Sequence, residues 1–219
     1  MPGALPGGCR ALVTDRSHGD LRAGLGPLAL ERRRAVVDLP WTTPRQVHGA
    51  GVLVLEEGSD GSAADAVVTA EAGRAIAVLG ADCALVGLAS TEGVLGVAHA
   101  GWRGLLAGVL GATVAAMHRL GAGSITAVLG PCIHRECYAF GTDDLDAVAA
   151  RLGPRVRART MAGAPALDLP SGVAVALARA GVGPPEPLAG CTACDGRFFS
   201  HRARAEEGRH ALVLYRGVA

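Results

Sequence analysis

The chain has 219 residues, 50% of them hydrophobic, and a formal net charge of +1 at pH 7. This charge argues against a nucleic-acid surface as its main function, and no apolar run reaches the roughly 18 residues that a membrane span needs. The first residues lack the charged and apolar regions of a signal peptide. We therefore expect a cytoplasmic protein with one domain over residues 1–219.

Strand and helix patterns alternate along the chain, which is typical of an α/β fold. Helical spacing of apolar residues predicts helices over 28–37, 105–120, 143–152 and 171–180. Short apolar runs predict strands over 11–14, 52–55, 66–69, 75–79, 84–88, 94–98, 125–129 and 210–215. Three of these strands are apolar almost throughout, which is typical of strands covered on both faces.

A histidine closes one predicted strand in the stretch Val97–Gly104, and Arg103 follows it in a glycine-punctuated turn where a helix begins. The first N–H groups of a helix lack intrahelical partners and attract anions. Arg103 and the N–H groups at Gly104 are therefore candidates for holding phosphate. The alternative is a strand–turn–helix joint whose His99 is only hydrogen-bonded.

Three potential zinc ligands stand at the ends of strand patterns, each beside a glycine or a turn: His48, Cys83 and His99. A catalytic zinc ion typically takes three protein ligands and leaves one position open. Asp82 or a backbone carbonyl could fix the histidine tautomers. The spacing matches no standard zinc motif, so a buried cysteine and two hydrogen-bonded histidines remain the alternative.

Six cysteines in a cytoplasmic chain are expected to be reduced, structural, catalytic or metal-bound. Cys191 and Cys194 form a CxxC pair, for which the lack of a partner motif favours a structural or incidental role. Cys132 and Cys137 flank His134, where either a nucleophilic cysteine or a simple turn fits the sequence. Three other histidines are interpreted as surface or structural residues: His18, His118 and His210.

Several motifs occur in the order expected of the YfiH-like family, which is also called laccase-domain, polyphenol-oxidase-like or purine nucleoside phosphorylase. The chain resembles this family over nearly its whole length, from Thr14 to the last strand. The segments that carry the resemblance are Gln46–Gly49, Ala81–Cys83, His99–Gly104, Leu129–Pro131 and Phe198–Arg202.

The resemblance implies an α/β sandwich with mixed β-sheets and flanking helices. It also implies one zinc ion per chain, held by His48, Cys83 and His99. The expected reaction is phosphorolysis of adenosine, inosine and methylthioadenosine, with adenosine deamination as a second activity. Older assignments in the family imply a copper-dependent polyphenol oxidase, and some members are linked to the correction of peptidoglycan precursors.

In this interpretation zinc would activate water for attack on purine C6. Asp82 is the candidate proton shuttle beside the ligand Cys83. Arg103 and Gly104 would hold phosphate. Three further residues are assigned to substrate binding because their motifs recur together with the metal motifs: Arg16, Gln46 and Arg202.

The sequence departs from the family pattern at three places. His18 replaces a glycine of the N-terminal signature, the segment between that signature and Gln46 is short, and Ala139 stands where the family has a glutamate. Two other functions stay open. A structural zinc module would need a fourth ligand such as Cys132 or His134, and a metal-free hydrolase would use Cys83 with His99. Multicopper oxidation is disfavoured because it needs more histidines than the chain offers.

Overall fold

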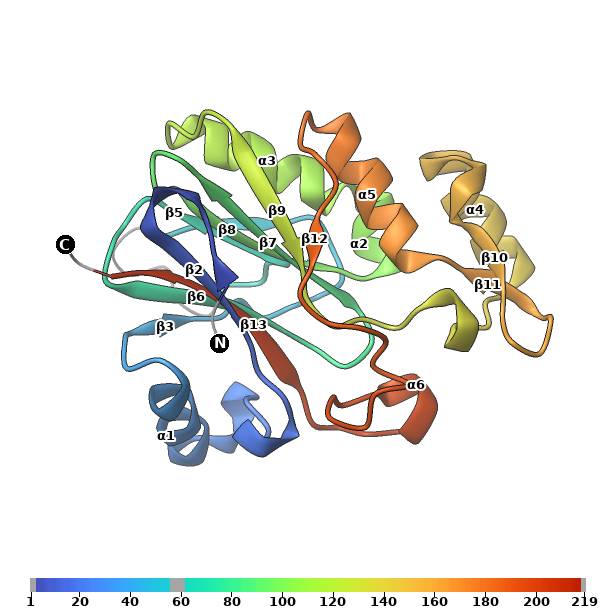
Figure 1. Cartoon of the computed structure of the whole chain (residues 1–219), viewed down its shortest axis with the longest axis horizontal. Coiled ribbons are helices and arrows are strands. Elements are labelled where there is room, and N and C mark those ends of the chain that lie inside the picture. The colour runs from blue at the N-terminus through green and yellow to red at the C-terminus, as the bar shows by residue number, and fades with distance from the viewer. Residues whose placement is uncertain (1–2, 56–61, 218–219) are drawn as a thin grey trace.

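The computed structural model describes residues 3–55 and 62–217, which build two stacked β-sheets with helices outside them (Figure 1). The larger sheet has the strand order β12-β9-β7-β8-β5-β4. Its neighbours are antiparallel except for the parallel pairs at its two edges, β12–β9 and β4–β5. The strands are β4 (Val52–Val54), β5 (Ala66–Thr69), β7 (Ala84–Ser90), β8 (Leu95–Ala100), β9 (Ile125–Leu129) and β12 (Glu186–Pro187).

The smaller sheet has the order β1-β2-β13-β6-β3 and lies against one face of the larger sheet. Its strands are β1 (Gly3–Ala4), β2 (Cys9–Val13), β3 (Trp41–Thr42), β6 (Arg74–Gly80) and β13 (His210–Arg216). A separate antiparallel pair consists of β10 (Arg157–Arg159) and β11 (Pro165–Leu167).

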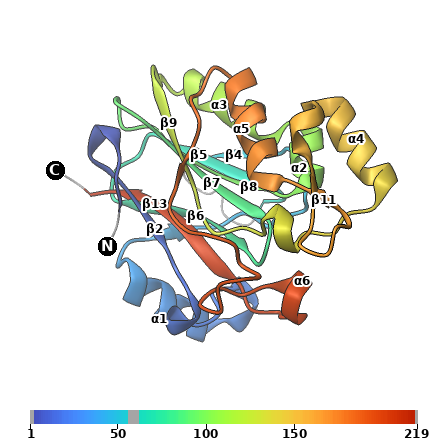
Figure 2. The same cartoon turned by 45° about the vertical axis from the view of Figure 1, so that its right-hand side comes forward.

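The α-helices lie on the outer sides of the two sheets: α3 and α5 cover the larger sheet, and α1 lies beyond the smaller one (Figures 1 and 2). They are α1 (Pro27–Val36), α2 (Trp102–Ala107), α3 (Val109–Arg119), α4 (Thr142–Leu152), α5 (Leu169–Arg179) and α6 (His201–Arg204). Five short 3-10 helices connect other segments: η1 (Pro6–Gly8), η2 (Arg16–His18), η3 (Ala23–Leu25), η4 (Arg135–Cys137) and η5 (Pro154–Val156).

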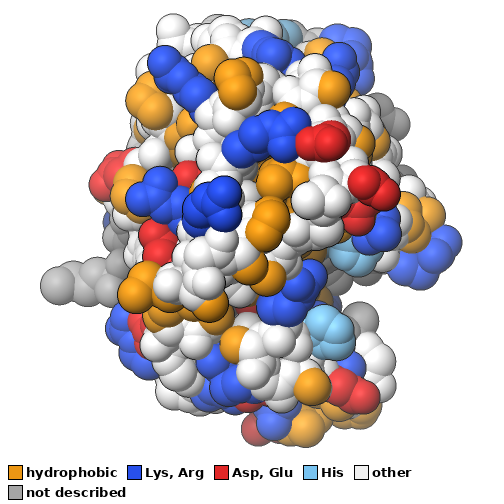
Figure 3. All heavy atoms as spheres, turned by 90° about the vertical axis from the view of Figure 1, so that its right-hand side faces the viewer, with side chains coloured by type: hydrophobic (Ala, Val, Ile, Leu, Met, Phe, Trp, Pro, Cys, Tyr) orange, Lys and Arg blue, Asp and Glu red, His pale blue; other side chains and the backbone are white. Residues whose placement is uncertain are grey.

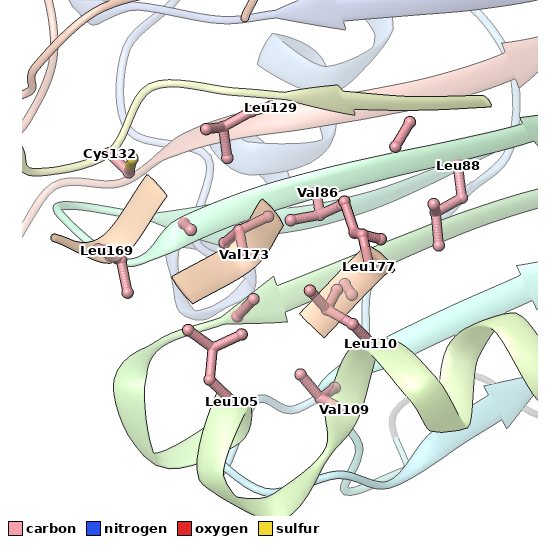
Figure 4. Packing of buried hydrophobic residues seen from close by; sticks show 14 of the residues in the cluster. Val86, Leu88, Leu105, Val109, Leu110, Leu129, Cys132, Leu169, Val173 and Leu177 are labelled. Atoms are coloured by element: carbon pink, nitrogen blue, oxygen red, sulfur yellow. The ribbon is translucent and has the colours of Figure 1, made fainter. Parts of the chain in front are cut away.

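The central strand β7 is buried along its whole length, as its apolar sequence predicts. Val86 and Leu88 pack toward α3 and α5 (Figure 4), whereas Leu85 contributes to the core between the sheets. A Cβ atom on Gly87 would lie only 2.7 Å from a methyl group of Leu214 in β13. Glycine therefore lets the two sheets approach closely at the centre of the sandwich.

The predicted helix over 105–120 is two helices, and the first begins earlier, at Trp102. Gly108 separates them in the left-handed conformation, with φ 88° and ψ 28°. Glycine adopts this conformation without the steric cost that a Cβ atom imposes. The continuous apolar spacing concealed the break, because both helices turn apolar residues toward the same sheet.

The other predicted helices are confirmed to within a few residues of their ends, and each predicted strand overlaps an observed one. Six strands and helices without a sequence signal have two to four residues and are too short for a periodic pattern: β1, β3, β10, β11, β12 and α6. No helix in the described part of the chain is long and apolar enough to cross a membrane.

The predicted structural histidines differ in their surroundings. The ring of His18 lies 2.9 Å from a carboxylate oxygen of Asp15, and the ring of His118 lies 2.7 Å from the carbonyl oxygen of Ala122. His210 is buried in β13, and burial lowers its pKa to about 4. None of the three belongs to the candidate ligand clusters found among the described residues.

The break between α2 and α3 can be tested with two glycine substitutions that meet no neighbouring atoms within 4 Å. Gly108→Ala should lower the free energy of unfolding by about 1–2 kcal/mol, because alanine resists the left-handed conformation. The matched control Gly111→Ala lies within α3 and should raise it by about 0.5–1 kcal/mol. Urea denaturation measures the free energy of unfolding of both variants. Equal changes in the two variants would contradict a helix break at Gly108.

Candidate metal centre

The structure brings His48, Cys83 and His99 together, although 35 and 16 residues separate them along the chain. Their potential ligand atoms all lie within 4.8 Å of one another. The Sγ atom of Cys83 is 4.0 Å from Nε2 of His48, and the two imidazole rings meet edge to face with centroids 4.8 Å apart. The predicted ligand set is therefore one compact cluster.

Strand pairing explains this convergence. Ala84 of β7 lies opposite Ala100 of β8, so Cys83, at the entrance to β7, comes beside Gly101 at the exit from β8. His99 lies one residue before that exit and is almost completely buried. A Cβ atom on Gly101 would lie 2.9 Å from the Cys83 sulfur, so a side chain there would press on the ligand.

The carboxylate of Asp65 connects two of the three potential ligands. It lies 2.9 Å from Nδ1 of His99 and accepts the backbone N–H groups of Val47, His48 and Gly49 at 3.2, 2.9 and 2.6 Å. Asp65 is fully buried. A ring whose Nδ1–H donates to a carboxylate presents its Nε2 lone pair to a metal, which is a common arrangement at metal sites.

Asp65 also holds a strained backbone in place. His48 has a positive φ of 60°, which is uncommon for a residue with a side chain. The three consecutive N–H groups that Asp65 accepts surround this residue and stabilise its left-handed conformation. The expectation that Asp82 or a backbone carbonyl fixes the tautomer of His99 is thus corrected: Asp65 does so.

The electrostatics of the metal-free cluster favour ionised ligands. Burial opposes ionisation of the Cys83 thiol, but hydrogen bonds from His48 and His99 outweigh it and lower its pKa to about 6. Burial also disfavours a charged His99, but Asp65 and the Cys83 thiolate raise its pKa to about 9. A divalent cation would take the place of the proton on this imidazole and face a thiolate already formed.

The ligand set fits a zinc ion. Zinc binds thiolate at about 2.3 Å and imidazole at about 2.0–2.1 Å, so one ion can bridge sulfur and nitrogen atoms up to about 4.4 Å apart. The Cys83–His48 separation of 4.0 Å lies within that reach. The cluster contains neither Cys132 nor His134, the fourth ligands that a closed structural site would need.

The carboxylate of Asp82 binds the C-terminal segment formed by residues 192–202. Its buried carboxylate accepts hydrogen bonds from Thr192 Oγ1 at 2.6 Å, Ser200 Oγ at 2.7 Å and the backbone N–H of Arg202 at 2.6 Å. Its φ is 99°, so these bonds hold a second strained residue next to a ligand. The geometry gives Asp82 the function of anchoring the turn before Cys83.

The ligand cluster lies in the wall of a cavity of about 640 Å³, a volume in the range of small-molecule sites. Arginine and histidine side chains gather beside a hollow on the face that carries α6 (Figure 3). The cavity is lined by the three potential ligands and by Arg22, Thr43, Pro44, Arg45, Gln46, Leu79, Gly80, Ala81, His201 and Arg209.

Several residues assigned to substrate from the sequence are engaged elsewhere, outside this lining. Arg16 bonds the carbonyl oxygens of Gly196 and Phe198 and pairs with Glu206. Arg202 donates to the carbonyl oxygen of Ala139 at 2.8 Å.

Arg103 is exposed and lies over the ring of Trp102, with its guanidinium carbon 4.1 Å from the ring centroid. Gly104 is buried, and a Cβ atom there would lie 3.2 Å from the carbonyl oxygen of Gly49. Gly104 therefore allows α2 to approach the loop that carries His48.

Gln46 does line the cavity, but its amide bonds the backbone of Leu79 in both directions, at 2.8 Å each. These two hydrogen bonds join the loop that carries His48 to the end of β6, as the backbone hydrogen bonds of a neighbouring strand would.

Sequence reasoning did not identify Asp65, Arg22, Arg45, His201 or Arg209. Asp65 had a usable signal, because it is the single charged residue in the apolar stretch 63–68. The arginines had none, since arginine is frequent throughout this chain and only the folded cavity distinguishes them.

The link between Asp65 and the ligands generates a prediction. Asp65→Asn should weaken metal binding by about 10–100-fold, because the amide no longer accepts every N–H group that the carboxylate does. The control Asp168→Asn makes the same change at the N-cap of α5, where asparagine caps about as well as aspartate, and should leave metal affinity unchanged. Titration with a competing chelator measures affinity, and equal losses in both variants would contradict the assigned role.

Comparison with known proteins identifies relatives along most of the chain. The protein named purine nucleoside phosphorylase ORF3 of Streptomyces griseus is 43% identical over 177 residues, which cover 78% of this chain and 72% of that protein. A Xylella fastidiosa protein named purine nucleoside phosphorylase is 38% identical over 215 residues, covering 89% and 82%.

Solved structures show the same fold. A Neisseria meningitidis protein aligns with a TM-score of 0.86 and 29% identity, covering 100% of this chain and 99% of its own. Bacillus licheniformis YfiH aligns with a TM-score of 0.82 and 23% identity, covering 95% and 92%. Residues 28–216 match the model of the family described as multi-copper polyphenol oxidoreductase laccase. The chain therefore belongs to that family, the YfiH-like family that its motifs indicate.

Proposed function

We propose that this protein is a zinc-dependent purine nucleoside phosphorylase acting on adenosine, inosine and methylthioadenosine, with adenosine deamination as a second reaction of the same site. The observation that supports this most strongly is the position of the His48–Cys83–His99 cluster in a cavity lined by arginines. The names of the Streptomyces and Xylella relatives agree with it. The substrates are then a nucleoside and phosphate.

His48, Cys83 and His99 would hold the zinc ion, which supplies Lewis acidity through an open coordination position. Asp65 keeps the His99 ring in one tautomer and one orientation. Asp82 anchors the turn before Cys83 through its contacts with the C-terminal segment. These two carboxylates act on the ligands, and we place neither in contact with substrate.

Phosphate would bind to the arginines of the cavity wall. Arg45 and Arg209 both line this wall and bring positive charge to it. Arg45 is exposed, whereas the guanidinium of Arg209 is held in place by the carbonyl oxygens of residues 206–208. Arg22 contributes less, because Asp20 and Glu207 lie 2.8 and 3.6 Å from its guanidinium and balance its charge. Guanidinium groups bind phosphate oxygens by charge-assisted hydrogen bonds.

In the reaction, a phosphate oxygen attacks C1′ of the ribose while the bond from C1′ to the purine nitrogen breaks. The purine leaves with the bonding electrons and takes up a proton. We assign His201 to hydrogen-bond the departing purine, because it lies in the same cavity wall as Arg209. A general acid at this position would lower the barrier to departure of the base.

Copper-dependent phenol oxidation is the competing function, since the description of the family names multi-copper laccases. Reduction of oxygen to water takes four electrons and needs several coppers held mainly by histidines. Within residues 3–55 and 62–217, the His48–Cys83–His99 group is the one metal-competent cluster that contains histidine. Metal analysis separates the two functions: zinc at this cluster favours phosphorolysis, and several coppers per chain favour oxidation.

The direct test is incubation of the zinc-loaded protein with adenosine and phosphate, followed by product identification. Adenine and ribose 1-phosphate are expected, with inosine as the product of deamination. Cys83→Ala should lose one bound metal ion and both activities, whereas Cys9→Ala, which alters a buried cysteine in β2, should keep both. Full turnover in the Cys83 variant would overturn the proposal.

The role of the arginines in the cavity is tested separately. Arg45→Gln should raise KM for phosphate about 10–100-fold, because a hydrogen bond to a charged group contributes about 1.5–3 kcal/mol. Arg119→Gln, an exposed control at the end of α3, should leave KM unchanged. If Arg103→Gln raises KM and Arg45→Gln does not, phosphate binds at α2 as the sequence motif predicts.

A further inference from the structure

Three cysteines outside the His48–Cys83–His99 cluster form a second compact group. Cys137 ends η4, while Cys191 and Cys194 lie in the loop between β12 and α6. Their sulfur atoms all lie within 4.8 Å of one another, and the sulfurs of Cys137 and Cys194 are 3.2 Å apart. The CxxC pair thus has a partner, supplied from more than 50 residues away.

The local backbone already has the form of a thiolate-binding turn. The N–H of Asp195 bonds the carbonyl oxygen of Cys191 at 2.9 Å, which closes the CxxC segment into one tight turn. The Cys191 sulfur accepts the backbone N–H of His134 at 3.3 Å. Hydrogen bonds of this kind stabilise ligating sulfur atoms.

A positively charged side chain, Arg204, lies beside the CxxC turn. The guanidinium of Arg204 donates to the carbonyl oxygens of Thr192 and Ala193, both at 3.1 Å. These two residues lie between the two cysteines of the turn. Three thiolates around one divalent cation carry a net charge of −1. Arg204 offsets it in part, because Glu206 also lies 3.1 Å from its guanidinium.

A disulfide accounts for this arrangement less well than a metal does. A disulfide joins two sulfurs at about 2.03–2.05 Å and would leave the third cysteine of the group unused. One zinc ion with bonds of about 2.3 Å can bridge thiolates up to about 4.6 Å apart. A CxxC pair joined by a third cysteine from another segment supplies three of the four ligands that zinc takes.

We propose that Cys137, Cys191 and Cys194 form a second metal site, which binds one thiophilic divalent cation such as zinc. Cys194 is exposed, so water can complete the coordination. The bound ion would tie η4 to the CxxC turn. We assign it no part in the chemistry of the reaction proposed for the cavity.

The second site would also position the first. Thr192, inside the CxxC turn, donates to the carboxylate of Asp82 at 2.6 Å, and Asp82 directly precedes Cys83. The backbone N–H of Thr192 donates to the carbonyl oxygen of Cys132 at 3.0 Å, which joins the CxxC turn to the segment that follows β9. A metal that fixes the CxxC turn therefore fixes the residue that anchors Cys83.

The test counts metal ions in the purified full-length chain after growth with zinc. Two zinc ions per chain are expected in the wild type, one in Cys194→Ser, one in Cys83→Ala and none in the double variant. Cys9→Ser is the matched control and should keep two ions. Circular dichroism verifies that each variant is folded, and the exposure of Cys194 makes its serine variant the least disruptive one.

A spectroscopic readout identifies the ligands without reference to activity. Cobalt added to metal-free Cys83→Ala should produce an intense thiolate-to-metal charge-transfer band, and Cys137→Ser or Cys194→Ser in that background should abolish it. The proposal is overturned if Cys194→Ser binds as much metal as the wild type. It is also overturned if intact mass reveals a disulfide between Cys137 and Cys194 in the isolated protein. If Cys83→Ala loses a metal ion and Cys194→Ser loses none, the second site is refuted, and the function proposed for the cavity is unaffected.

Discussion

The buried carboxylate of Asp65 is the interaction on which the candidate metal centre depends. A buried charge is costly unless hydrogen bonds satisfy it, and all of its donors here belong to the ligand region. Three are backbone N–H groups around His48, and the fourth partner is the ring of His99. The cost of burying Asp65 is therefore offset only when both histidines occupy the geometry that lets them share one ion.

The β-sandwich supplies the frame for this arrangement. The register between β7 and β8 places Cys83 beside the exit from β8, and the antiparallel pairing of β5 with β8 brings Asp65 next to His99. Glycines allow close approaches at Gly87, between the sheets, and at Gly101, against the Cys83 sulfur. The packing and register of the strands thus set the positions of Cys83 and His99, and Asp65 holds the loop that carries His48.

Charge around the cavity illustrates the limits of motif-based inference. The arginines assigned to substrate from the sequence, such as Arg103 and Arg202, lie outside the cavity lining and stack on neighbouring rings or bond loop carbonyls. The positive charge in the cavity comes from Arg45, which directly precedes the Gln46–Gly49 motif, and from Arg209, which lies far along the sequence. Cysteine behaves in the same way, because Cys137 meets the CxxC turn only in the folded chain.

Most helices and strands could be predicted from the order of the amino acids, because amphipathic spacing and apolar runs report burial directly. The chemistry of the side chains and the order of their motifs also singled out His48, Cys83 and His99 as candidate metal ligands, which the fold brings together. Tertiary structure decided the break at Gly108, the role of Asp65 and the lining of the cavity. These features depend on backbone conformation and on contacts between distant segments, which local spacing does not encode.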